Sequence, residues 1–360
     1  MKVSYVMNVL NGEPFIKYQL DSIYKFAHEI IIIEGAYLKF SHATINGRSK
    51  DNTIKTIENY NDEENKIKLI TNDGFYNDRK EMCNEFLKYV TGEIIWQIDA
   101  DEFYFPETHK YVHDIFQSDP ELDLLSFNFK DYYINTSYYI MGYESIGLTN
   151  VNRVHRYEKN NIWVNQRPPT LGYENGELKK IRKKIEGPQL EKDRHVMHHA
   201  TMIFDEQITD KFKYYNSMWS NVNKPTKWYK DTWLDFENKF NVAGFRANIT
   251  FLLENKDDVP FHLKLLFEDV NKGLVPGYRL RDDTKVRVFI NSTRYKEYKD
   301  IATSVDNVTS SPLIKSLMAY LLICLRSFKI TERKSFLYLH YVLVRKVMSK
   351  LKSSIQRSGK

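Results

Sequence analysis

Two aspartates stand one residue apart directly after a short apolar segment of this 360-residue chain. The segment Ile94–Ile98 is typical of a buried strand, and Asp99 and Asp101 follow it at once. Two carboxylates in this pattern can point to the same solvent-facing edge. They suit Mg²⁺ or Mn²⁺, which usually bridge to substrate phosphates, where such an ion stabilises a departing diphosphate as a Lewis acid. The other interpretation is a turn cap and a solvated strand end, and the spacing leaves both open.

Three histidines lie within five residues about one hundred positions further on. They are His195, His198 and His199, followed by Ala-Thr-Met-Ile at 200–203. Imidazole is a common ligand for transition metals such as Mn²⁺. A single histidine is more often structural, but three so close together also indicate a metal site.

The elements that must position these residues alternate between strand and helix over residues 1–130. This alternation predicts a doubly wound α/β sheet. Ligands of such sheets bind beyond the carboxyl ends of the strands, so polar residues at those ends are expected at one edge. The expected strands are Val3–Val9, Glu29–Glu34, Ile67–Ile70, Glu93–Ile98 and Leu122–Phe129. The expected edge residues are Asn8, Glu34, Asp73 and Asp99.

The stretch Gly-Phe-Tyr-Asn-Asp-Arg-Lys-Glu-Met-Cys-Asn-Glu at 74–85 and the motif Asp-Ala-Asp-Glu-Phe at 99–103 together resemble family-2-like glycosyltransferases of the GT-A fold. The first strand and Glu-Gly-Ala at 34–36 are also similar to nucleotide-binding segments of that family. The resemblance implies a GT-A-like (Rossmann-like) mixed sheet. It implies a hexosyltransferase that uses Mn²⁺ or Mg²⁺ and moves a sugar from a UDP- or GDP-hexose to a glycan or glycolipid, with inversion.

The resemblance also implies roles for individual residues. Asp101 would coordinate the metal on the donor diphosphate, and Asp99 would contact the ribose or the metal. Glu34 would meet the nucleoside, and Arg79 would lie near the base or a phosphate. The run His-His-Ala-Thr-Met-Ile at 198–203 is similar to a segment in which a histidine completes the metal or diphosphate site. His198 and His199 are therefore candidate metal ligands, and the sequence does not choose between them.

The sequence departs from the family in its acceptor half. Many members carry a Glu-Asp pair whose aspartate is the catalytic base, and residues 130–220 contain no such pair. A transfer with inversion still needs a carboxylate near the acceptor hydroxyl. Four carboxylates are candidates, and none outranks the others by spacing: Asp131, Glu144, Glu174 and Asp205.

Three regions are predicted along the chain. A catalytic domain would occupy residues 1–220, with a nucleotide-sugar half at 1–130 and an acceptor half at 131–220. Residues 221–311 would form a mainly helical extension, and residues 312–360 a basic amphipathic helical tail. The tail holds eleven Lys or Arg residues and one acid, a net charge of +10, so the overall +6 leaves −4 for residues 1–311. A mildly acidic body argues against nucleic-acid binding.

The tail has two interpretations of equal weight. Its apolar stripes and basic residues suit an anionic membrane surface, which would fit a lipid-linked or surface-polysaccharide acceptor. The alternative is a helical hairpin that packs on the catalytic domain. The N-terminus does not read as a signal peptide, and two cysteines predict no disulfide framework. The expected location is the cytoplasm, with peripheral attachment to the inner face of a membrane.

Two rival functions are compatible with parts of the pattern. A sugar nucleotidyltransferase usually has a Gly-rich basic loop after its first strand, and Asn-Gly-Glu-Pro at 11–14 matches this poorly. A non-catalytic, membrane-associated glycan-binding protein would not need both aspartates and the histidine pair. The chain also lacks the Gly-rich phosphate-binding motifs of nucleotide hydrolases and dinucleotide enzymes. The segment Arg-Val-His-Arg at 153–156 is interpreted as a solvated strand rather than a phosphate contact.

Overall fold

The computed structural model describes residues 1–142, 150–166, 168–218, 229–234, 250–293, 295–297 and 300. The chain divides into two compact units. The first comprises residues 1–139, 148–223 and 254–281, and the second comprises residues 140–147, 224–253 and 282–360. Every candidate site residue except Glu144 belongs to the first unit.

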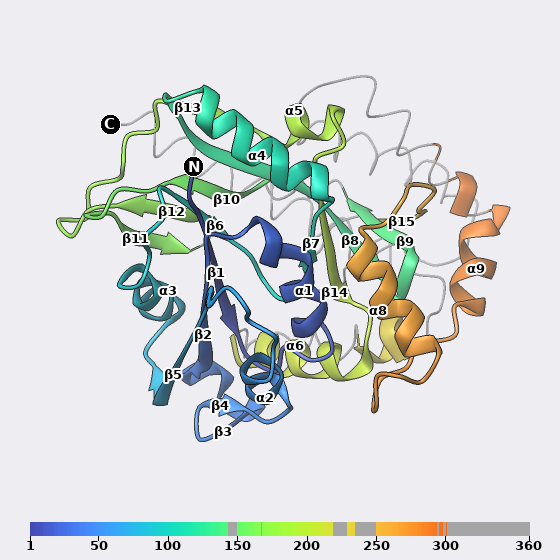
Figure 1. The fold of residues 1–360 in the computed structure, drawn as a ribbon. Helices are drawn as coiled ribbons and strands as arrows, with labels where there is room; N and C mark the ends of the chain where they lie inside the picture. The colour runs from blue at the N-terminus through green and yellow to red at the C-terminus, as the bar shows by residue number, and fades with distance from the viewer. Residues whose placement is uncertain are drawn as a thin grey trace, which may run out of the picture. The chain divides into compact units, whose positions relative to one another are not determined.

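A mixed sheet forms the centre of the first unit (Figure 1). Four strands run parallel in the order β6 (Ile94–Gln97), β1 (Val3–Val9), β2 (Glu29–Tyr37) and β5 (Ile67–Tyr76). The antiparallel strand β10 (Asn150–Arg156) joins β6 to β8 (Leu122–Tyr133). The strands β2 and β6 are buried apolar runs without alternation because both faces of the sheet are covered there, whereas β5 carries polar residues such as Lys68 and Asp73.

Two short pairings beside the main sheet carry the candidate histidines. Strand β14 (Met197–Met202) runs antiparallel to β7 (Glu102–Phe103) and parallel to β8. The register sets His199 opposite Glu102 on β7 and opposite Asp131 on β8. This pairing places the histidine segment directly beside the two aspartates, although the aspartates come about one hundred residues earlier in the sequence.

Helices surround this sheet and supply further polar residues. Asp78 caps α3 (Arg79–Leu87), because its side chain accepts a hydrogen bond from the Glu81 N–H at 2.8 Å. Pro106 begins α4 (Pro106–Ser118), because its fixed φ suits the first helical position. The remaining longer helices of the first unit are α1 (Ile16–Ile23), α6 (Asp205–Met218) and α8 (Phe261–Asn271).

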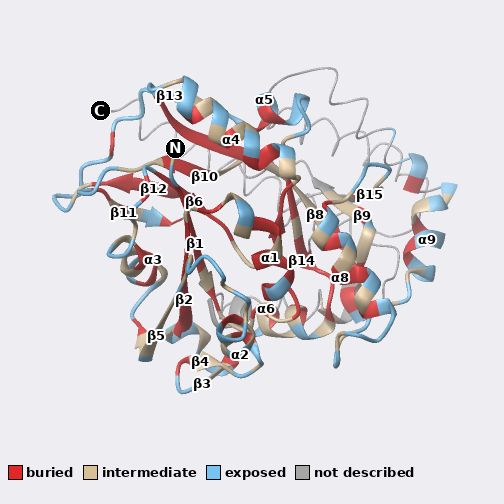
Figure 2. Ribbon diagram, in the orientation of Figure 1, coloured by how far each residue is buried: buried red, intermediate tan, exposed pale blue. Residues whose placement is uncertain are grey.

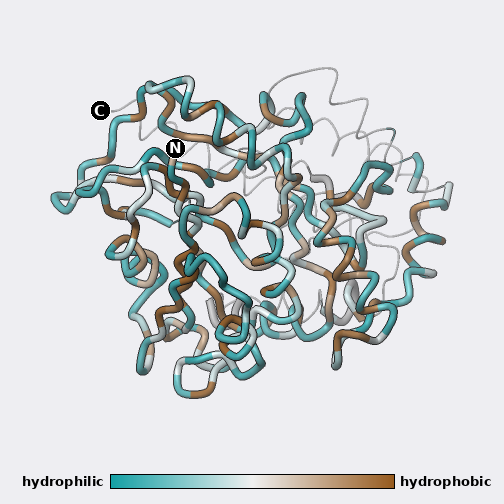
Figure 3. The backbone as a smooth tube through the Cα atoms, viewed as in Figure 1, coloured by the Kyte–Doolittle hydropathy of each residue, from teal (hydrophilic) through white to brown (hydrophobic). Residues whose placement is uncertain are grey.

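The core lies between the sheet and these helices. Figure 2 shows the central strands as buried, whereas α3 and α4 expose one side to solvent. Figure 3 shows hydrophobic residues gathered along β1 and β2. Trp96 of β6 is fully buried and stacks on Tyr5 and Phe127, with ring centroids 5.3 and 5.9 Å apart. This packing fixes the strand that leads into the two aspartates.

Smaller elements complete the described chain. They are η1 (Tyr24–Phe26), η2 (Leu38–Ala43), β3 (Thr44–Ile45), β4 (Arg48–Ser49), α2 (Thr53–Glu58), β9 (Asn135–Gly142), β11 (Ile162–Gln166), β12 (Pro169–Gly172), β13 (Lys183–Ile185), α5 (Gly187–Lys192), η3 (Tyr229–Leu234), β15 (Thr250–Glu254) and α9 (Thr284–Asn291). Among the described residues, every helix is too short or too polar to cross a membrane.

The predicted α/β class with a mixed sheet is confirmed. The expected strand Val3–Val9 has the predicted bounds, whereas β2 and β5 continue to Tyr37 and Tyr76, past the expected ends. Beyond residue 130 the sequence predicts a strand only at 153–156, which lies within β10, and not the other strands of this region. The tail at 312–360 lies outside the described residues, so its helices, its membrane contact and the three-region division stay predictions.

Candidate active site

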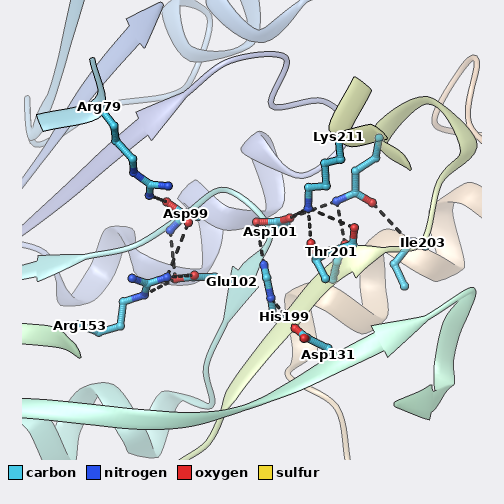
Figure 4. Close-up of polar contacts among 12 residues, drawn as sticks. Arg79, Asp99, Asp101, Glu102, Asp131, Arg153, His199, Thr201, Ile203 and Lys211 are labelled. Carbon is cyan, nitrogen blue, oxygen red and sulfur yellow. Dashed lines mark hydrogen bonds and ion pairs between the residues drawn. The ribbon is translucent and has the colours of Figure 1, made fainter. Parts of the chain in front are cut away.

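Asp99 and Asp101 lie in a tight turn between β6 and β7. The Asp99 N–H donates to Glu102 Oε2 at 3.2 Å, and the Glu102 N–H donates to the Asp99 carbonyl at 3.1 Å. Figure 4 shows that the two carboxylates have different partners. Asp99 lies between two arginines, whereas Asp101 lies between a lysine and a histidine.

The surroundings of Asp99 are strongly basic. Arg79, the first residue of α3, places Nη2 3.8 Å from Asp99 Oδ1, and Arg153 of β10 places Nη2 3.7 Å from Oδ2. Arg153 also binds Glu102 through both Nε and Nη2, with an Nε–Oε2 distance of 2.9 Å. The Glu102 side chain is fully buried. Burial raises the pKa of Glu102 despite the opposing charge of Arg153.

The interpretation of Arg153 as part of a solvated strand is therefore wrong. Its side chain is only 8% exposed because the guanidinium is paired inside the protein. The pairing with Glu102 and Asp99 raises the pKa of Arg153 further, although burial alone would lower it. Arg153 belongs to the site, and its closest partner, Glu102, lies 51 residues away in the sequence.

Asp101 is surrounded by three donors from two later elements. Lys211 Nζ and Gln207 Nε2, both on α6, lie 3.2 and 3.1 Å from Asp101 Oδ2, and His199 Nε2 lies 3.6 Å from Oδ1. Burial alone would raise the pKa of the Asp101 carboxyl. Lys211 and His199 outweigh that effect and hold the pKa well below its usual range, so Asp101 is ionised at neutral pH.

His199 bridges two carboxylates. Its Nδ1 lies 2.6 Å from Asp131 Oδ1, and its Nε2 faces Asp101 (Figure 4). Burial opposes the imidazolium form, but the charges of Asp101 and Asp131 raise the pKa of His199 to about 10. The His199 ring is therefore protonated at neutral pH in the ligand-free protein.

The other two histidines have different surroundings. His198 is buried and its Nδ1 lies 2.7 Å from the Tyr132 hydroxyl, with Phe105 packed edge-on against the ring. Burial lowers the pKa of His198 to about 3. His195 stacks on Tyr111, with ring centroids 4.3 Å apart. Of the three, the structure places only His199 against Asp101.

Two acceptor atoms are buried near the carboxyl end of β1, one on β1 itself and one on the neighbouring part of β2. Glu34 has no exposed surface, and its Oε1 accepts the Ser49 N–H at 2.7 Å. Within the described part of the chain, Glu34 Oε2 and Asn8 Oδ1 have no hydrogen-bond partner. Burial raises the pKa of Glu34, although Ser49 opposes this. Asp73, at the same edge, has a 98% exposed side chain that pairs with Arg48 at 2.8 Å.

The four base candidates lie in different places. Asp131 is engaged with His199. Asp205 lies in the first turn of α6, with Oδ1 3.7 Å from Arg281 Nε. Glu174 is exposed in the turn that follows β12, and Glu144 lies outside the described residues. Asp131 is connected to Asp101 through His199.

The donor atoms present fit a divalent ion whose coordination is completed by substrate. Within the described residues, no cluster of three or more His, Cys, Asp or Glu side chains could hold a metal by itself. Asp101 and His199 still offer one carboxylate oxygen and one imidazole nitrogen that face each other. Mg²⁺ is typically bound through one or two carboxylates plus phosphates and waters, so a two-ligand protein site is sufficient.

Comparisons with known proteins give the family. A model of glycosyl transferase family 2 matches residues 4–211. The structure of Mycobacterium tuberculosis glucosyl-3-phosphoglycerate synthase with Mn²⁺, UDP and glucosyl-3-phosphoglycerate is similar at 17% identity and a TM-score of 0.27, covering 37% of this chain and 44% of that one. S. aureus TarS 1–349 with UDP is similar at 12% identity and a TM-score of 0.35, covering 65% and 74%.

These structures do not determine the substrates of this chain, because the similarity is low and the chain spans less than half of the mycobacterial enzyme. Among curated proteins no significant match is found. The family model, in contrast, matches more than half of the chain and includes both aspartates, His199 and Lys211. The chain belongs to glycosyl transferase family 2 and has the mixed α/β fold that its resemblance to GT-A glycosyltransferases implies.

Proposed function

We propose that this protein transfers a hexose from a nucleotide-diphosphate sugar to a hydroxyl of a glycan or glycolipid, with the help of Mn²⁺ or Mg²⁺. The observation that carries this proposal is the cluster of Asp101, His199 and Lys211 at the carboxyl edge of the sheet. The cluster combines metal ligands with a cation that can bind phosphate. A transfer from a nucleoside diphosphate needs both, because the leaving group gathers negative charge.

Asp101 and His199 would hold the ion, which supplies Lewis-acid stabilisation to the departing diphosphate when it is bound. Lys211 contacts Asp101 in the ligand-free protein, and its ammonium would be available to the diphosphate when Asp101 holds the ion. Arg79, which is 28% exposed, can reach the same phosphates. Asp99 would orient Arg79 or contact the ribose, and the buried pair of Arg153 and Glu102 would fix Asp99.

Glu34 and Asn8 support a nucleoside pocket at the other end of the same edge. Each has a buried acceptor without a partner among the described residues, and such acceptors are costly unless a ligand satisfies them. Glu34 has one such oxygen, because Ser49 occupies the other. The free Glu34 oxygen by itself matches the single N3–H of uracil, whereas Glu34 Oε2 and Asn8 Oδ1 together match the two adjacent donors of guanine. Both a UDP-sugar and a GDP-sugar are therefore candidate donors, and UDP is the first probe. Since Glu34 is fully buried, the base can reach it only if the β3–β4 segment moves.

Inversion at the transferred sugar and attachment of the tail to an anionic membrane remain predictions from the sequence. A sugar nucleotidyltransferase is the rival enzyme, and the two are distinguished by their products. A glycosyltransferase releases a nucleoside diphosphate, whereas a nucleotidyltransferase releases pyrophosphate.

A thermal-shift panel of UDP- and GDP-sugars, with and without Mn²⁺, tests the proposal. We expect stabilisation by UDP- or GDP-sugars that depends on Mn²⁺ and disappears in Asp101→Ala. Asp119→Ala is the control, because Asp119 forms an ion pair with Lys183, outside the cluster. Metal-independent stabilisation, or equal stabilisation in Asp101→Ala, would contradict the assignment of the donor site.

A further inference from the structure

The backbone places Asp131 and His199 next to each other on two neighbouring strands. Strand β14 lies between β7 and β8, and the parallel register of β14 and β8 sets His199 directly opposite Asp131. Side chains directly opposite each other on neighbouring strands point to the same face and lie within reach of each other. The pairing is therefore a consequence of strand register and not of a mobile loop.

The side-chain geometry gives each ring nitrogen of His199 its own carboxylate. Nδ1 lies 2.6 Å from Asp131 Oδ1, while Nε2 lies 3.6 Å from Asp101 Oδ1. Phe129, also on β8, packs edge-on against the imidazole, with ring centroids 6.2 Å apart. The His199 and Asp131 side chains are 21% and 24% exposed, so protein surrounds most of both. The contact with Asp131 fixes which nitrogen faces Asp101.

We propose that Asp131 is a positioning residue that accepts the Nδ1–H of His199 and so directs the Nε2 lone pair to the metal at Asp101, once metal binding has released the Nε2 proton of the ligand-free ring to solvent. The inference rests on the proposed metal-dependent function. Metal-ligating histidines generally donate their other ring N–H to a carboxylate or carbonyl, which fixes the tautomer and increases the basicity of the ligand. Asp131 occupies that place relative to Asp101.

This role differs from that of a catalytic base, the role for which the sequence made Asp131 a candidate. A base must be free to accept a proton from the acceptor hydroxyl. Asp131 instead uses Oδ1 for His199. The two roles predict opposite results for metal binding. Loss of a positioning residue weakens the metal site, whereas loss of a base lowers turnover and leaves metal affinity unchanged.

The test measures the Mn²⁺ concentration that gives half-maximal UDP binding to the full chain, by isothermal titration calorimetry. For Asp131→Ala we expect this concentration to rise by about 10- to 100-fold, the usual effect of removing such an outer carboxylate. Asp131→Asn keeps an acceptor oxygen of the same shape, so its value should lie between those of the wild type and Asp131→Ala. Asp119→Asn should behave like the wild type.

A double variant makes the test specific to the pair. If Asp131 acts only through His199, then Asp131→Ala should add little to the effect of His199→Ala. Unchanged Mn²⁺ dependence in Asp131→Ala and Asp131→Asn, together with lost turnover, would overturn the inference and make Asp131 the base. If His199→Ala binds Mn²⁺ normally while Asp101→Ala does not, the inference fails but the proposed function stands. If wild-type UDP binding ignores Mn²⁺, the proposed metal dependence and the inference both fail.

Discussion

Lys211 offers a test in which removing a positive charge should tighten the binding of a cation. Its ammonium lies 3.2 Å from Asp101 Oδ2, which is the carboxylate proposed to hold the metal. Without nucleotide, an incoming Mn²⁺ must displace Lys211. At this distance and an effective dielectric constant of about 20, the attraction between the two charges is about 5 kcal/mol. The Lys211 side chain is 33% exposed, so desolvation and solvent screening reduce the net value to about 1–2 kcal/mol.

Lys211→Met should therefore bind Mn²⁺ about 5- to 30-fold more tightly than the wild type in the absence of nucleotide. With Mn²⁺ at saturation, the same variant should bind UDP more weakly, because the released ammonium no longer contacts the diphosphate. Electron paramagnetic resonance of free Mn²⁺ measures the first affinity, and isothermal titration calorimetry measures the second.

Lys213→Met is the matched control, because Lys213 lies on the same helix, is 53% exposed and pairs with Asp210. Its Mn²⁺ and UDP affinities should equal those of the wild type. If Lys211→Met binds Mn²⁺ no more tightly than the wild type, Lys211 does not compete with metal for Asp101, and the proposed exchange is refuted.

Three further predictions concern neighbouring parts of the molecule. Asp101→Ala should keep the fold and lower kcat/KM by at least about 100-fold, because the diphosphate loses its counter-charge. Circular dichroism checks the fold and steady-state kinetics measure kcat/KM. Full activity would contradict the assignment of the donor site. Arg153→Met should lower the free energy of unfolding by about 3–5 kcal/mol, because Glu102 is left buried without its partner. Urea unfolding measures this loss. The double variant Arg153→Met with Glu102→Gln should recover part of it. Burial lowers the pKa of His198 to about 3, so the folded state keeps this histidine neutral, whereas the unfolded chain binds a proton below about pH 6.5. The free energy of unfolding should therefore fall as pH drops from about 6.5 towards 3, by up to about 1.4 kcal/mol per pH unit. Urea unfolding at pH 7.5 and 5.5 should show a smaller loss in His198→Gln, and an equal loss would contradict the burial argument.

Much of the fold of the nucleotide-sugar half, residues 1–130, can be predicted from local sequence patterns. Apolar segments of a few residues predict β1, β2 and β6. The rule that ligands bind at the carboxyl ends of parallel strands then brings Glu34 and Asp99 to one edge. These inferences need only residue type and spacing over a few positions, so the sequence is sufficient for them.

The choice between His198 and His199 depends on long-range information. Neighbouring residues of a strand face opposite sides, so one of the pair must point away from Asp101. Which one does so is set by the register of β14 against β7 and β8, and β7 is only two residues long. No apolar alternation in His-His-Ala-Thr reveals that register.

The burial of Arg153 cannot be predicted from the sequence for a related reason. A charged residue in a strand is usually solvated, and it is buried only when a partner neutralises it. The partner Glu102 comes from a different strand, and the sequence around Arg153 gives no sign of it. The catalytic base is still unassigned for the same reason, because the acceptor half is defined by contacts between distant segments.

Crystals grown with UDP and MnCl₂ and measured at the manganese absorption edge test whether Asp101 and His199 hold a metal ion on the diphosphate. We expect one anomalous peak within about 2.0–2.3 Å of an Asp101 carboxylate oxygen and of His199 Nε2, in contact with the UDP diphosphate. Lys211 should then no longer contact Asp101. A UDP-bound structure without manganese at Asp101, or with manganese coordinated by other side chains, would contradict the proposed metal site.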